Sequence, residues 1–125
     1  MLYLEDGILY LTKGDDGALE LGAILDARGV AYDMQDGDFL TLTVRETPTL
    51  DSPVVFQTAS LPGSNRLIVR SEDTARAEPG RYSADIQLTT VDGLRFTIWP
   101  SIEGSARYKA SNLKNLIIMP EVTAV

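Results

Sequence analysis

The residues that could carry chemistry in this chain are carboxylates, because the sequence contains no histidine and no cysteine. Their absence excludes serine–histidine and cysteine–histidine catalysis, disulfide bonds, and cysteine-ligated zinc or iron–sulfur sites. Catalysis by Asp/Glu pairs or by lysine remains formally open. No carboxylate pair stands in a recognisable catalytic frame, however, so we expect no enzyme activity, no catalytic residues and no cofactor.

Two acidic clusters are the candidates for a metal site: residues 14–17, with the sequence GDDG, and residues 33–38, with the sequence DMQDGD. An EF-hand calcium loop needs carboxylates at alternate positions and a glutamate at position twelve. Counting from Asp33, position three is Gln35 and position twelve is Val44, so that pattern fails. Asp and Gly are favoured in tight turns, because they tolerate positive φ and bond their own backbone. We therefore predict structural turns and no metal ligands.

The net charge of −7 argues against polyanionic partners. An acidic chain is repelled by phosphate backbones and by anionic membrane surfaces, so we expect neither nucleic acid nor membrane as a partner. No apolar run approaches the roughly 20 residues of a membrane span. The start, MLYLEDGILYL, lacks the basic segment and cleavage site of a signal peptide, which predicts synthesis and folding in the cytoplasm.

Alternation of apolar and polar residues predicts short strands along most of the chain. In residues 39–46, Leu40, Leu42 and Val44 alternate with polar residues, as in an antiparallel strand with one buried face. Strands separated by Gly, Pro and Asp turns predict an all-β fold, an antiparallel, immunoglobulin-like β-sandwich of about seven to nine short strands. The others are expected at residues 8–12, 18–25, 30–32, 54–58, 66–70, 85–90, 94–99, 101–109 and 116–119.

The length of 125 residues is typical of one domain. We assign a sandwich domain to residues 1–112 and a C-terminal strand or arm to residues 113–125. The apolar segment from Leu113 to Met119 either completes the core of its own chain or pairs with another subunit. The one rival to an all-strand chain is the segment 71–78, in which one helical turn at Asp73-Thr74-Ala75, before Pro79, is left open as an alternative.

Asp92-Gly93, between two alternating runs, predicts a β-hairpin. Asp85 lies in the first of these runs, on the same strand face as Gln87. This carboxylate either faces solvent or forms a structural pair, for which Arg95 across the hairpin is the candidate.

Four aromatic residues, Phe96, Trp99, Tyr82 and Tyr108, are the candidates for a sugar-binding platform. The expected alternation places Phe96 and Ile98 on one strand face and Trp99 on the other. Aromatic residues in sheets more often form core or subunit contacts.

The segment 71–88, SEDTARAEPGRYSADIQL, is typical of the corner at which a chain enters a sandwich strand. In immunoglobulin domains, a tyrosine at this corner bonds upstream backbone and precedes a cysteine by two residues. Here the Pro79-Gly80 turn precedes Tyr82, and Ala84 stands where the cysteine would be. We expect Tyr82 to anchor the strand in a domain that is not a true immunoglobulin domain.

The order of these motifs resembles the N-terminal domain of phage baseplate upper proteins and of related small prophage proteins. The segments that carry the resemblance are a Gly-Asp turn at 14–16, the strand at 37–45, the Asp-Thr-Ala turn at 73–75, residues 79–88 and the strand at 96–98. The resemblance implies a β-sandwich subunit of a tail or baseplate, located in the virion after synthesis in the bacterial cytoplasm.

In such a particle the chain would act through homo-oligomeric contacts and contacts with other tail or baseplate proteins, without catalytic residues. Beyond Trp99 the sequence departs from the family pattern, which favours a compact accessory subunit over a linker to a receptor-binding protein. A carbohydrate- or ligand-binding β-sandwich module is the alternative function.

Overall fold

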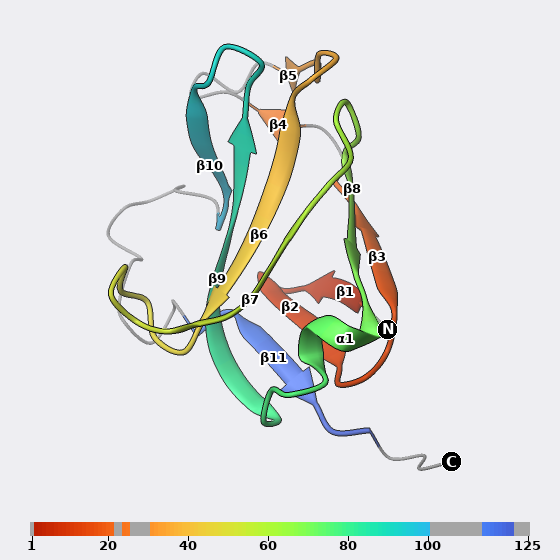
Figure 1. Ribbon diagram of the computed structural model, residues 1–125, viewed down its shortest axis with the longest axis vertical. Coiled ribbons are helices and arrows are strands. Elements are labelled where there is room, and N and C mark those ends of the chain that lie inside the picture. The colour runs from red at the N-terminus through yellow and green to blue at the C-terminus, as the bar shows by residue number, and fades with distance from the viewer. Residues whose placement is uncertain (1, 22–23, 26–30, 101–113, 122–125) are drawn as a thin grey trace.

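The structure, a computed structural model, describes residues 2–21, 24–25, 31–100 and 114–121 (Figure 1). This part of the chain is almost entirely β-structure, as predicted. It contains one helical turn, α1 (Ser71–Thr74), and eleven strands. The strands are β1 (Leu2–Glu5), β2 (Ile8–Thr12), β3 (Gly17–Glu20), β4 (Ile24–Leu25), β5 (Ala31–Tyr32), β6 (Phe39–Arg45), β7 (Val54–Ala59), β8 (Arg66–Val69), β9 (Gly80–Thr89), β10 (Arg95–Trp99) and β11 (Leu116–Met119).

The strands form one large sheet and two small ones. Six strands of the seven-stranded sheet follow the order β1-β2-β11-β9-β6-β7, and the seventh strand, β10, pairs with β9. The pairs β3–β8 and β4–β5 form the two-stranded sheets. Among the described strands every pairing is antiparallel except β2–β11, which is parallel, so the large sheet is mixed rather than purely antiparallel as the sequence suggested.

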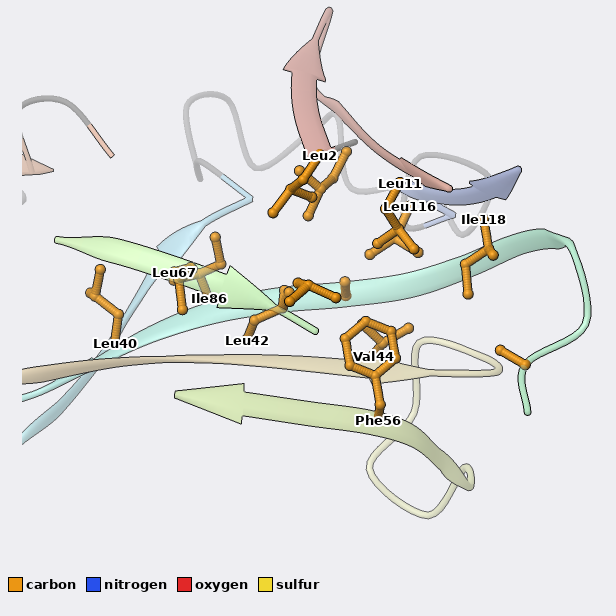
Figure 2. Close-up of a cluster of buried hydrophobic side chains, with 14 of the residues drawn as sticks. Leu2, Leu11, Leu40, Leu42, Val44, Phe56, Leu67, Ile86, Leu116 and Ile118 are labelled. Atoms are coloured by element: carbon orange, nitrogen blue, oxygen red, sulfur yellow. The ribbon is translucent and has the colours of Figure 1, made fainter. Parts of the chain in front are cut away.

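Strand β9 joins the two halves of the large sheet. Its first residues pair with β11 and its remaining residues pair with β6, so one long strand belongs to both halves. Figure 2 shows Leu2, Leu11 and Leu116 from β1, β2 and β11 pointing toward Val44 and Phe56 on β6 and β7. The sheet therefore bends around a single core and gives a sandwich-like fold.

The core consists of the inward residues of these strands together with β8. Leu40, Leu42 and Val44 are all buried, which confirms the inward face predicted for β6. Leu67 and Val69 contribute from β8 and close the core on the side of the small β3–β8 sheet. Burial of a Leu or Val side chain stabilises the fold by roughly 1.5–3 kcal/mol, so these strands contribute much of the stability.

Close packing between β1 and β3 requires a glycine at the start of β3. A Cβ atom added to Gly17 would lie 2.6 Å from the Cβ atom of Leu2, closer than real side chains approach. The side chain of Leu2 is buried in the core at this point. Strand β1 itself had no counterpart among the expected strands.

The C-terminal strand β11 lies inside the sheet of its own chain. It pairs with β2 on one side and with β9 on the other, and Leu116 and Ile118 are buried. The assembly-arm alternative is therefore wrong for Leu116–Met119, and the core-strand alternative holds. The expected domain boundary at 112/113, the expected strand at 101–109 and Tyr108 lie outside the described residues.

The predicted hairpin is present, and so is the helical turn that the sequence left open. Gly93 adopts φ 84° in the loop between β9 and β10, and its N–H bonds the carbonyl of Thr90 at 2.9 Å. This tight loop with a left-handed glycine is a common hairpin connection. The helical turn α1 ends five residues before Pro79, within the segment expected to contain it.

Candidate functional site

The second acidic cluster folds into a turn around one buried carboxylate. Asp38 is fully buried, and its carboxylate accepts hydrogen bonds from the Tyr32 hydroxyl at 2.5 Å, the Gln35 N–H at 2.8 Å and the Val91 N–H at 2.9 Å. The Tyr32 and Gln35 hydrogen bonds hold the pKa of Asp38 below its usual value, although burial acts in the opposite direction. Because three donors surround it, this carboxylate is ionised and structural.

Asp38 also links loops that are far apart in the sequence. Its carboxylate reaches Val91 in the β9–β10 loop, and its carbonyl accepts a hydrogen bond from Gly63 N–H at 2.7 Å. The 33–38 turn therefore lies between the 61–65 loop and the β9–β10 loop, and all three lie at the upper end of the molecule in Figure 1.

Large apolar side chains are exposed at this end. Leu61 is 74% exposed, Val91 64%, Leu94 58% and Phe96 50%. We call these four residues the hairpin tip. The exposed aspartates Asp33, Asp36 and Asp92 lie in or beside the same loops. Clustered apolar groups with a polar rim are typical of a protein-binding surface.

The first acidic cluster holds α1 in place. The Asp16 carboxylate accepts a hydrogen bond from Ser71 N–H at 2.7 Å, and Gly14 N–H donates to the buried Thr74 hydroxyl at 2.9 Å. The turn at 14–17 is thus structural, as predicted. Across the described residues, no three His, Cys, Asp or Glu side chains converge in a way that could hold a metal ion.

Asp85 does not pair with Arg95, so that expectation is wrong. In the register of the hairpin Arg95 lies opposite Thr89, four residues further along β9 than Asp85. Asp85 lies opposite Thr43 of β6 and is half-buried. Burial raises the pKa of Asp85, and the nearby Arg45 guanidinium on β6 partly offsets this increase. The cation near Asp85 therefore comes from the neighbouring strand.

The described aromatic candidates do not form a common platform. Tyr82 lies opposite Leu116, whereas Phe96 lies opposite Leu88, six residues along β9 and about 20 Å away. A bulge between Thr97 and Trp99 shifts the register, and Trp99 packs against the core. The expected placement of Trp99 on the face opposite Phe96 is therefore wrong, because one extra residue reverses the alternation.

Tyr82 forms the predicted corner. Its hydroxyl donates a hydrogen bond to the backbone carbonyl of Glu78, four residues upstream, across the Pro79-Gly80 turn. Burial, with the negative charges of Glu46 and Glu78, raises the pKa of the Tyr82 hydroxyl. The hydroxyl is thus a neutral donor, and the tyrosine anchors the start of β9 as expected.

One aromatic pair was not among the candidates. The rings of Tyr3 and Tyr10 stack on the outer face of the β1–β2 hairpin, with centroids 4.9 Å apart and an interplanar angle of 12°. The alternation in MLYLEDGILYL carried a signal for it, because Leu2 and Leu9 alternate with the two tyrosines. The pairing register that joins the tyrosines is not visible in the sequence.

Comparisons with known proteins give no relative for this chain. No family model, no curated protein and no solved structure matches it. Among the described residues, no helix is long and apolar enough to cross a membrane.

Proposed function

We propose that this chain is a non-catalytic structural subunit of a phage or prophage particle, of the tail or baseplate type. It acts by self-assembly and by docking to other virion proteins, and its location is the virion. The proposal draws on the order of the motifs between residues 14 and 98. The β-sandwich fold is compatible with that role.

The hairpin tip is the observation that carries the docking part of the proposal. Four large apolar side chains are each half or more exposed: Leu61 and the pair Val91 and Leu94 come from two loops, and Phe96 comes from the start of β10. Both loops are bonded to the buried Asp38, one through its carboxylate and the other through its backbone carbonyl. A surface whose backbone is already fixed loses little conformational entropy on binding, which favours affinity. The exposed tip is therefore suited to bury its apolar groups against another protein.

The aspartates around the tip indicate the chemistry of that partner. Asp33, Asp36 and Asp92 are exposed in or beside the loops. Two exposed arginines, Arg66 and Arg95, begin the strands β8 and β10 that follow these loops, so the aspartates outnumber the arginines by three to two. An acidic rim around an apolar centre is complementary to a surface with an apolar centre and a Lys/Arg rim. We expect the docking partner to be a protein with such a basic rim.

The carbohydrate-binding alternative has no comparable support. Tyr82 is occupied at the corner, and Trp99 packs on the core. Phe96 alone among the described candidates is half-exposed.

Detection of the chain in purified particles tests the proposal. Particles from the bacterium that produces the chain are purified by density gradient and analysed by quantitative peptide mass spectrometry. We expect the chain to sediment with the particles at a constant copy number relative to the tail proteins. Complete, infective particles that contain no copies, with all of the chain left in the soluble fraction, would contradict the proposal.

A further inference from the structure

The β1–β2–β11 half of the large sheet is apolar on both faces. Its inner face holds buried leucines and an isoleucine of the core. On its outer face the alternation places partly exposed aromatic and aliphatic residues, which we call the tyrosine face: Tyr3, Ile8, Tyr10, Ile117 and Met119. Strands that are apolar on both faces are typical of sheets covered on both sides.

The other half of the sheet differs sharply. On β6 the outward residues are Phe39, Thr41, Thr43 and Arg45, and on β9 they include Asp85 and Gln87. Apart from Phe39 at the start of β6, the outward residues of these two strands are polar, which is the pattern of strands with one solvated face. The contrast within one sheet indicates that the tyrosine face has a partner.

The strand register places the central residues of the tyrosine face in one row. Tyr3 lies opposite Tyr10, Tyr10 lies beside Ile117, and Ile117 lies opposite Arg81 of β9. At the spacing of paired strands, this row is about 14 Å wide. Tyr and Arg are the residue types that most often dominate binding energy at protein interfaces.

Two opposite charges flank the tyrosine face. Glu5 lies on the outer face at the β1 edge, and Arg81 lies across the row on β9; both are exposed. In a chain of net charge −7, this surface carries one charge of each sign. When two identical surfaces meet about a two-fold axis, each Glu5 can face the Arg81 of the other copy, so the charges are self-complementary.

We propose that the tyrosine face is a two-fold interface between two copies of this chain. The inference gives a location to the self-assembly part of the proposed function and rests on it. The stacked tyrosines and Ile117 form the apolar centre, and two Glu5–Arg81 contacts form the rim. The face is small, so the dimer belongs to the weak, transient class of interfaces.

Sedimentation equilibrium tests the proposal on the full chain at about 10–500 µM, the range in which weak dimers dissociate. We expect the wild-type chain to show a monomer–dimer equilibrium. Arg81→Glu should raise the dissociation constant by about tenfold, because the substitution is present in both copies and removes both Glu5–Arg81 contacts of the two-fold dimer. Arg95→Glu makes the same change of charge on β10 and serves as the matched control, with little effect expected.

Glu5→Arg separates a specific contact from general repulsion. This substitution lowers the net negative charge, so general electrostatics alone would strengthen association. The proposed interface instead places the introduced guanidinium against Arg81 of the other copy, and we expect weaker association. The double variant Glu5→Arg/Arg81→Glu should restore the wild-type dissociation constant.

A wild-type chain that stays monomeric over the concentration range of about 10–500 µM would overturn the inference. So would a dimer that responds equally to Arg81→Glu and Arg95→Glu. Both charged residues are exposed, so loss of folding is not expected, and circular dichroism verifies it. A monomeric chain still found in purified particles would overturn the dimer and leave the proposed docking function standing.

Discussion

The side-chain amide of Asn115 bonds both backbone groups of Ala84. Its oxygen accepts a hydrogen bond from Ala84 N–H at 2.8 Å, and its nitrogen donates to the Ala84 carbonyl at 2.9 Å; both residues are buried. On this side of β9 the partner changes from β11 at Tyr82 to β10 at Ile86. The amide of Asn115 thus takes the place of a strand in the gap between β11 and β10.

Asn115→Ala should destabilise the protein by roughly 2–4 kcal/mol, because it leaves a buried N–H and a buried C=O without partners. Chemical denaturation monitored by circular dichroism measures the change. Asn65→Ala is the matched control, since the side chain of the exposed Asn65 donates a hydrogen bond to the Leu21 carbonyl. Equal losses in the two variants would contradict the role given to Asn115.

Asp38→Asn should lower the free energy of unfolding at neutral pH, because an amide nitrogen cannot accept the hydrogen bonds that the carboxylate accepts. The pKa of Asp38 is held below its usual 3.8, so its contribution is fully present above that value. It is lost as the pH falls through the lower, folded-state pKa. The gap between variant and wild type should therefore shrink below about pH 4.

Thermal unfolding across the pH range from about 2 to 7 measures this effect for Asp38→Asn and for Asp36→Asn, a control in the same turn. The Asp36 side chain is exposed, so only a small change in stability is expected there. A constant gap between Asp38→Asn and wild type down to the lowest pH would show that the charge of Asp38 contributes nothing.

Asp85→Asn should have the opposite effect and raise the free energy of unfolding at neutral pH. Burial raises the pKa of Asp85 above 3.8, so its ionised form is disfavoured in the folded state and costs stability above the folded-state pKa. The variant should be more stable than wild type at pH 7, and the gain should vanish as the pH falls below 3.8. The same thermal scans, with the exposed Asp51→Asn as the control, measure it; a loss of stability at pH 7 would contradict this account.

The features that the sequence predicted correctly are local. The Tyr82 corner spans four residues, and the Asp92-Gly93 hairpin is set by one glycine with positive φ. Alternation over a single strand identified the buried face of β6. In each case the residues that determine the structure are near neighbours in the chain, so their pattern is sufficient.

The features that the sequence did not predict depend on the pairing register between strands that are distant in the chain. The placement of β11 between β2 and β9 determines that Asn115 meets Ala84, 31 residues away. Similarly, pairing of β6 with β9 brings Arg45 near Asp85 in place of Arg95. The acidic turn at 33–38 was expected, but burial of Asp38 in particular depends on Val91, 53 residues away.

Docking in a particle through the hairpin tip is tested by a matched pair of substitutions. Leu94→Asp and Leu50→Asp make the same change at two exposed leucines. Leu94 lies in the β9–β10 loop, and Leu50 lies in the loop between β6 and β7, at the other end of β6 (Figure 1). The most direct measurement is the copy number of each variant in purified particles, by peptide mass spectrometry, after thermal unfolding has confirmed that both fold. We expect Leu94→Asp to fall at least about tenfold, as for a residue central to an interface, and Leu50→Asp to match wild type. Equal incorporation of the two variants would contradict docking through the tip.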